Sequence, residues 1–278
     1  MRVPVDIGGA NVLASFIIAL QTDRDIALPG LGGEALHGLV FEALRGHAKA
    51  FAEQLHAAQD DKPFTLSGLL TSHPKRDGRL HIPAQTTTEF RVSLLTDEMI
   101  EYTLTAFANL AATETPLRLG SGSARVQAIA FRPGTHPAVL SATYPALVQA
   151  ASDATRITLH FLSPTSFRAG DVQEILPKPE RVFGSLFNAW QTFAPIPFDH
   201  SLSDAFARIR VSEYDLRTEL VAFARYKVIG FKGRVTFTCP RDLDATMRRV
   251  INALADFACF AGVGYKTTMG LGQVHRRS

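Results

Sequence analysis

The sequence predicts an α+β fold made of two tandem ferredoxin-like units, each with the RRM-like element order strand, helix, strand, strand, helix, strand (βαββαβ). Short runs of apolar residues alternate with segments of helical periodicity, and the same six-element order occurs twice along the 278 residues. With 46% hydrophobic residues, a chain of this length can bury a substantial core. Fold class alone does not establish a function, because this architecture hosts many.

The two units are expected to be of ordinary domain size. We place an N-terminal unit at residues 1–133, a connector at 134–153 and a C-terminal unit at 154–278. A proline–glycine pair ends the last predicted strand of the first unit, and the connector contains a possible short helix at 144–150.

The first unit begins with a near-continuous apolar run at 12–20, which predicts a central strand. An apolar stripe from Leu36 to Leu44 then predicts a helix, which continues or restarts after Gly46. Thr96 can cap a second helix, because its side chain precedes a new stripe of helical spacing. The other segments are expected to be strands, at 64–72, 81–95 and 126–131, with a basic turn at 74–78.

The second unit repeats this order after the connector. An apolar stripe between Leu243 and Ala261 predicts its last helix. The expected elements are strands at 156–162, 208–216 and 219–229, helices at 179–193 and 241–261, and a short closing strand at the C-terminus.

A glycine-rich segment follows directly on this last helix. Its glycines permit positive φ angles and close approach of the backbone to a ligand, while Lys266 adds a cation and Thr267 and Thr268 add hydroxyls. The glycines are Gly262, Gly264, Gly270 and Gly272. This composition predicts a site for a phosphate backbone. The spacing is neither that of a P-loop nor that of a dinucleotide fingerprint.

Two other interpretations of this segment are less favoured. A flexible tail would also be rich in glycine, but the apolar residues after the loop indicate a closing strand instead. A nucleotide-binding enzyme is the least favoured function, since the acidic magnesium ligand expected near such a loop is missing.

The motif Gly262-Val-Gly-Tyr-Lys-Thr-Thr-Met-Gly-Leu-Gly-Gln-Val274 resembles the C-terminus of the CRISPR-associated repeat-processing (pre-crRNA) endoribonucleases of the RAMP superfamily. Three upstream segments also resemble family signatures, in the family's order: 55–65, 163–167 and 230–237. The resemblance therefore spans almost the whole chain. It implies that the glycine-rich loop contacts RNA and that the protein cleaves CRISPR precursor RNA within its repeats.

Metal-independent cleavage of RNA requires a base for the 2′-hydroxyl proton, an acid for the 5′-oxygen, and positive charge beside the phosphorane. Histidine suits either proton role, because its ordinary pKa of about 6.5 lies near neutrality. His56 ends the first helical region, and Lys62 follows six residues later in the next loop. By resemblance, the family's leucine–histidine pair and its following lysine map onto Leu55, His56 and Lys62.

Some members of the family add a tyrosine from the first helix, but the matching residue in this chain is Phe41, which cannot transfer a proton. His37 stands one helical turn earlier and could compensate, since other members place a catalytic histidine early in this helix. The structural alternative for His37 is a helix histidine that is satisfied by a backbone or carboxylate partner. Both interpretations stay open at this point.

For RNA binding, Lys266, Thr267 and Thr268 are the first candidates, followed by Lys232 and Arg234. The net charge of only +3 and the pI of about 9.0 permit a polyanionic partner without requiring one. The expected partner is CRISPR repeat RNA, with an effector complex or a homodimer as possible further ones. The alternative function is a non-catalytic RNA-binding RAMP subunit of an effector complex. A non-catalytic subunit of this kind has no need for the histidine and lysine of the 55–65 segment.

No metal or cofactor is expected, because no cysteine and histidine residues have ligand spacing. Cys239 and Cys259 lie among apolar residues, as small core residues do in a reducing compartment. A secretion signal and an apolar run of membrane-spanning length are both lacking, so we expect a cytoplasmic protein without a membrane partner.

Overall fold

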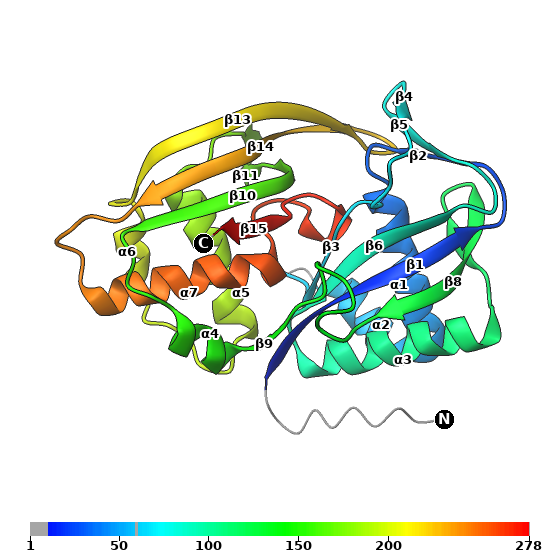
Figure 1. Ribbon diagram of the computed structural model, residues 1–278, viewed down its shortest axis with the longest axis horizontal. Coiled ribbons are helices and arrows are strands. Elements are labelled where there is room, and N and C mark those ends of the chain that lie inside the picture. Colours follow the sequence, from blue (N-terminus) through cyan, green and yellow to red (C-terminus); the bar gives the residue numbers. More distant parts are fainter. Residues whose placement is uncertain (1–10, 59–60, 278) are drawn as a thin grey trace.

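The computed structural model describes residues 11–58 and 61–277, and its two units lie side by side (Figure 1). The main elements of the N-terminal unit are β1 (Val12–Thr22), α1 (Gly33–His47), β3 (Phe64–Leu66), β6 (Thr87–Leu94), α3 (Asp97–Thr113) and β8 (Gly122–Ala130). Its main strands form an antiparallel sheet in the order β3-β6-β1-β8. The predicted central position of β1 is therefore confirmed.

The C-terminal unit has the same arrangement. Its main elements are β10 (Arg156–Thr165), α5 (Pro179–Phe193), β13 (Arg210–Ala222), β14 (Lys227–Thr238), α7 (Ala245–Ala261) and β15 (Val274–Arg277). The sheet has the order β13-β14-β10-β15. When the four main strands of each unit are numbered along the chain, both sheets have the spatial order second, third, first, fourth. The prediction of two tandem ferredoxin-like folds is confirmed.

Smaller elements complete the chain. They are β2 (Ile26–Pro29), α2 (Lys49–Ala57), β4 (Lys75–Arg76), β5 (Arg79–Ile82), β7 (Leu117–Leu119), β9 (Ser141–Thr143), α4 (Tyr144–Ala150), β11 (Phe167–Ala169), β12 (Val172–Glu174), α6 (Leu202–Phe206) and the 3₁₀ turn η1 (Thr267–Met269). The helix predicted after Gly46 restarts as α2, because Ala48 leaves the helical conformation. Helix α3 begins as predicted, with the Thr96 hydroxyl accepting a bond from the Met99 backbone N–H.

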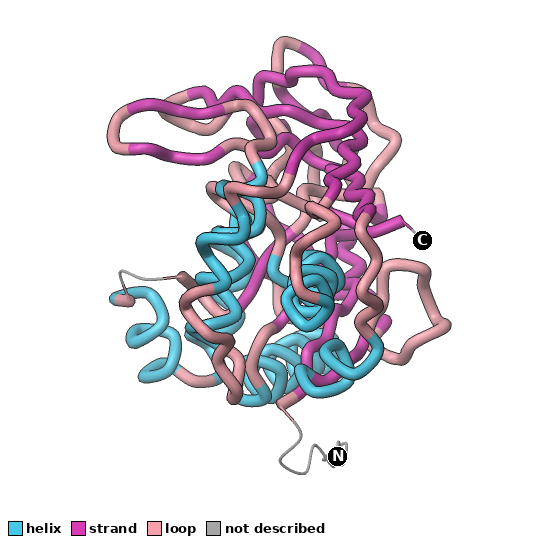
Figure 2. The backbone as a smooth tube through the Cα atoms, turned by 90° about the vertical axis from the view of Figure 1, so that its left-hand side faces the viewer, coloured by secondary structure: helices cyan, strands magenta, loops and turns pink. Residues whose placement is uncertain are grey.

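Each unit has its own apolar core. Leu36, Phe90 and Phe107 are fully buried in the N-terminal one, and Trp190 and Phe257 pack edge to face in the C-terminal one. Seen from the side, the helices lie mostly below, and the hairpin formed by β13 and β14 lies above them (Figure 2). The unit boundaries at residues 133 and 153 stay predictions.

Three predicted strands differ from the structure. The run 81–95 is split, because Gln85 adopts a positive φ of 56° and β5 pairs with β2 in a separate small sheet. The run 64–72 ends early at Leu66, where the chain turns to pack against Leu31. The strand expected at 208–216 extends beyond residue 216.

Strand β13 continues to Ala222, and the hairpin turn lies at 223–226. Thr218 of β13 pairs with Phe231 of β14, so the two strands stay together beyond residue 216. The long hairpin thereby arches from the C-terminal unit over to β2, β4 and β5 of the other unit (Figure 1). Within the described ranges, no helix has both the length and the apolar character that crossing a membrane requires.

Candidate active site

The glycine-rich loop is packed between the two units. Gly264 has a φ of 83°, and a Cβ atom there would lie 2.4 Å from the Ser166 carbonyl oxygen. Gly272 has a φ of 68°, and its Cβ atom would lie 2.2 Å from the Val263 carbonyl oxygen. These two glycines thus permit close approach to the protein's own backbone, where the sequence suggested approach to a ligand. The interpretation as a flexible tail is wrong, since residues 270–274 are buried.

The tip of this loop reaches helix α1. The Nδ1 atom of His37 lies 3.1 Å from the carbonyl oxygen of Thr268, and Gly270 forms a parallel bridge with Ser67 at the end of β3. A Cβ atom on Gly33, the first residue of α1, would lie 1.9 Å from the Met269 carbonyl oxygen. The start of the first helix and the C-terminal loop are therefore in direct contact.

The bond to Thr268 defines the state of His37. A carbonyl oxygen can only accept, so Nδ1 carries the proton and donates it. In the neutral imidazole, Nε2 then has a free lone pair and can act as a base. The structural alternative of a backbone-bonded histidine is thus correct for Nδ1, and it leaves Nε2 available for chemistry.

His37 and His56 both contact Phe41. The Phe41 ring centre lies 4.9 Å from that of His37 and 5.4 Å from that of His56. His56 is exposed in the last turn of α2, whereas His37 is half-buried and also stacks on Phe64. The two predicted catalytic histidines are therefore brought together around one apolar ring.

Lys62 lies at the end of α2. Its Nζ atom donates to the carbonyl oxygens of Leu55, at 2.7 Å, and Ala58, at 3.0 Å. An ammonium group has three N–H donors, and the described residues accept two of them. Burial lowers the pKa of Lys62. The same lysine lines a small cavity of about 40 Å³ together with Gly262 and Thr267 of the loop. Residues 59 and 60, within the matching family signature, lie outside the described residues.

The environment of His37 keeps it neutral. Burial lowers the pKa of His37 from 6.5 to about 4, and although the bond to Thr268 acts in the opposite direction, the nearby charges of Lys62, His56 and Lys266 lower it further. The imidazole is therefore a free base at pH 7. The other two predicted catalytic residues, His56 and Lys62, and the loop residue Lys266 thus all act electrostatically on the His37 ring.

Lys266, the predicted phosphate-binding cation, is half-buried among aromatic rings. Its Nζ atom lies 5.0 Å from the ring centre of Tyr265 and 5.2 Å from that of Tyr226. Burial acts to lower the pKa of Lys266, but hydrogen bonding to Tyr226 and the influence of Tyr265 outweigh it and raise the pKa. Thr267 and Thr268 are also half-buried. Contact of these residues with RNA stays a prediction.

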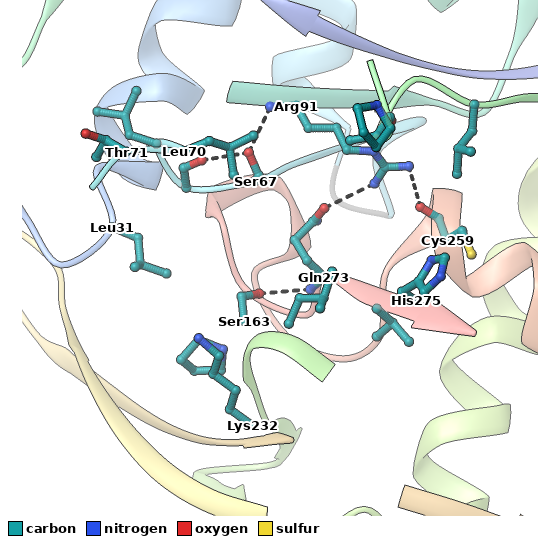
Figure 3. Close-up of a pocket in the computed structure, with 18 of the residues that line it drawn as sticks. Leu31, Ser67, Leu70, Thr71, Arg91, Ser163, Lys232, Cys259, Gln273 and His275 are labelled. Carbon is teal, nitrogen blue, oxygen red and sulfur yellow. Dashed lines mark hydrogen bonds between the residues drawn. The ribbon is translucent and has the colours of Figure 1, made fainter. Parts of the chain in front are cut away.

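Lys232 and Arg234 lie apart from this cluster, on β14. Lys232 lines a cavity of about 590 Å³ between the two units, and His37, His56 and Lys62 are not among the residues around it (Figure 3). Arg234 is exposed on the same strand and lies opposite Asp215 of β13. If Lys232 and Arg234 bind RNA, the part of the RNA that they contact differs from the part that the glycine-rich loop contacts.

The same cavity contains a residue that the sequence analysis missed. Arg91 on β6 is 9% exposed and donates to the carbonyl oxygens of Cys259 and Ala138 and to the Gln273 side chain (Figure 3). Burial lowers the pKa of Arg91 to about 10. The position of Arg91 between Phe90 and Val92 was the available signal in the sequence. Arg91 joins the N-terminal sheet to α7, the connector and the C-terminal segment.

Comparison with known families completes this description. The model of the CRISPR Cas6 N-terminal domain matches residues 13–149, and that of the CRISPR-associated endoribonuclease Cas6 matches residues 159–274. The chain belongs to the Cas6 family. The resemblance noted from the sequence motifs is therefore confirmed, and the family is one of CRISPR-associated endoribonucleases.

Individual Cas6 proteins align over most of the chain. The Mycobacterium tuberculosis "CRISPR-associated endoribonuclease Cas6" is 23% identical over 266 residues, covering 94% of this chain and 77% of that protein. A Cas6 product complex from Thermus thermophilus is 26% identical with a TM-score of 0.81, covering 96% of this chain and 100% of the other. A second Cas6 product complex is 28% identical with a TM-score of 0.76, at the same coverage.

We predict that Gly272→Ala destabilises this Cas6 protein, because alanine there meets both a positive φ and the Val263 carbonyl. The free energy of unfolding should fall by at least about 1–3 kcal/mol in urea denaturation. The control is Gly184→Ala in α5, where a Cβ atom meets nothing within 4 Å. It should raise that free energy by roughly 0.5–1 kcal/mol. Equal effects of the two substitutions would contradict the packed description of the loop.

We also predict that His37 titrates near pH 4, as its depressed pKa requires. Because the unfolded state binds the proton more tightly, stability rises with pH across the window from about 4 to 6.5 and is lost as the pH falls through it. The contribution is on the order of 3 kcal/mol. It should disappear in His37→Asn. Nitrogen-15 NMR of the imidazole measures the midpoint directly, and a value near 6.5 would contradict the buried, loop-bonded ring.

Proposed function

We propose that the protein cleaves CRISPR precursor RNA within its repeats by metal-independent transesterification, leaving a 2′,3′-cyclic phosphate and a 5′-hydroxyl. The observation that carries the proposal is the cluster of two imidazoles and one ammonium beside the glycine-rich loop. The similarity to Cas6 product and substrate-mimic complexes supports RNA as the partner.

In the proposed reaction, Nε2 of His37 removes the proton of the 2′-hydroxyl. The 2′-oxygen then forms a bond to phosphorus, and the bond between phosphorus and the 5′-oxygen breaks. His56 donates the proton that the departing 5′-oxygen takes up. The neutral state of His37 and its Nδ1-bonded tautomer support the assignment as base, and the exposed position of His56 suits a group that meets the leaving strand.

Positive charge at the phosphorane is assigned to Lys62. Lys62 and the loop residues Thr267, Gly262 and Gly264 border the same small cavity. Charge held in a partly dry site stabilises a developing anion more strongly than charge in water does. Phe41 takes no proton in this scheme; its ring separates the two imidazoles and fixes their orientation.

The remaining predicted binders are assigned to RNA away from the cleaved bond. Lys266, Thr268 and Gly270 belong to the loop surface next to His37, whereas Lys232 and Arg234 lie on β14 at the other cavity. An effector complex and a homodimer are kept as proposed further partners. Size-exclusion chromatography with light scattering, with and without repeat RNA, tests the homodimer.

The decisive experiment is single-turnover cleavage, in EDTA, of RNA containing the repeat of the accompanying CRISPR array. His37→Ala and His56→Ala should each lower the cleavage rate by roughly 10²- to 10⁴-fold, because each removes a proton-transfer group. RNA affinity should change little, and His200→Ala, an exposed histidine of the other unit, should cleave normally.

Two results would contradict this proposal. Cleavage that requires a divalent ion would exclude the acid–base mechanism. Tight RNA binding without any cleavage by the wild-type protein would favour the non-catalytic RAMP subunit. A substrate with a 2′-deoxy residue at the cleavage position serves as the control for binding without reaction.

For the β14 residues, we predict an effect on binding alone. Lys232→Ala and Arg234→Ala should each reduce the slope of log Kd against log salt by about 0.7–0.9, the value for one lost phosphate contact. Cleavage at saturating RNA should be unchanged. An unaltered slope in both variants would exclude these residues from the RNA interface.

A further inference from the structure

The tip of the β13–β14 hairpin is fixed next to the glycine-rich loop. The backbone N–H of Ala224 donates to the Glu34 carboxylate in the first turn of α1, at 2.8 Å. Lys75 and Glu219 form an ion pair of 3.0 Å at the base of the tip. Figure 1 shows the hairpin arching across both units to this position. The C-terminal unit thus places a rigid segment over the start of the helix that contains His37.

Aromatic side chains from this tip and from the loop surround Lys266. The Lys266 ammonium lies 5.2 Å from the ring centre of Tyr226, 5.7 Å from that of Phe223 and 5.0 Å from that of Tyr265. The Phe223 and Tyr226 rings stack on each other, 4.9 Å apart and inclined by 12°. The Sδ atom of Met269 lies 3.6 Å from the same ammonium. Ring faces attract a cation, so this aromatic cage holds the lysine side chain in place.

The held lysine has an unusual backbone conformation. Its φ of 60° and ψ of 38° are left-handed, which costs a residue other than glycine roughly 1–2 kcal/mol. The Lys266 carbonyl oxygen accepts the backbone N–H groups of Met269, at 2.9 Å, and Leu271, at 3.3 Å. Those bonds close the turn η1, which presents the Thr268 carbonyl to His37. The attraction between the cage and the ammonium therefore offsets the cost of the left-handed backbone of Lys266. The orientation of His37 depends on that backbone conformation.

We propose that Phe223 and Tyr226 are positioning residues for cleavage: they hold Lys266, and through η1 they fix the ring orientation and tautomer of His37. This inference rests on the proposed function of His37 as the base. In this proposal the hairpin tip transfers no proton at the reacting bond. Its effect reaches the site through Lys266 and Thr268, and a base displaced by about 1 Å can lose on the order of 10²-fold in rate.

The test uses Phe223→Leu and Tyr226→Leu, singly and together, with Tyr226→Phe as the conservative variant. Tyr214→Leu is the control, because Tyr214 is 73% exposed on the same hairpin and lies outside the cage. In the free protein, nitrogen-15 NMR of His37 should change from the Nδ1-protonated form to a mixture of tautomers in the double variant. Tyr214→Leu should retain the wild-type spectrum, and Tyr226→Phe, which keeps the ring but loses the hydroxyl, should change it less than Tyr226→Leu does.

In single-turnover cleavage at saturating repeat RNA, the double variant should be about 10- to 100-fold slower. Its Kd for the RNA should stay within about threefold of the wild-type value. A weakened Kd with an unchanged rate at saturation would overturn the proposal and make the rings an RNA-binding platform. An unchanged His37 spectrum would also overturn it.

A second variant guards against misfolding. Lys266→Met leaves the aromatic residues in place, removes only the caged charge, and should disturb the same His37 signals in the free protein. If His37→Ala cleaves normally, the proposed function fails. The free-protein spectra nevertheless decide whether the cage positions the ring, so the two failures are distinguishable.

Discussion

A hydrogen bond between the imidazole of His37 and the carbonyl of Thr268 joins residues 231 positions apart in the chain. The rest of the candidate site depends on it. The bond requires the start of α1 to lie beside the end of α7, and it requires a loop after α7 that can fold back tightly between the two units. The glycines of that loop satisfy the second requirement, because side chains there would collide with the protein's own backbone.

The same contact connects structure to chemistry. Burial and the neighbouring Lys62, His56 and Lys266 lower the pKa of His37 and hold it neutral, while the carbonyl occupies Nδ1 and leaves Nε2 as the acceptor. Phe41 cannot transfer a proton, and in our account that role falls to His37, one helical turn earlier. Lys62 closes the cluster from the end of α2, where two carbonyl oxygens hold its ammonium.

Much of the fold could be predicted, because it depends on local patterns: the apolar run of β1, the stripes of α5 and α7, and the Thr96 cap. The turn at 223–226 could not, since cross-strand pairing and the contact with Glu34 decide it, and neither leaves a local signal. His56, His37 and Lys62 were identified by residue type and by resemblance. Arg91 and the cage around Lys266 were missed, because each is made by segments that meet only in the folded chain.

The central claim is that the scissile phosphate binds between the glycine-rich loop and the imidazole of His37. A crystal structure with repeat RNA that has a 2′-deoxy residue at the cleavage position tests it most directly. We expect the sugar 2′ position within about 3–3.5 Å of Nε2 of His37, a distance from which proton transfer is feasible, with the bond from Nδ1 to Thr268 intact. A scissile phosphate seated instead in the cavity beside Lys232 and Arg91, away from both histidines, would contradict the account.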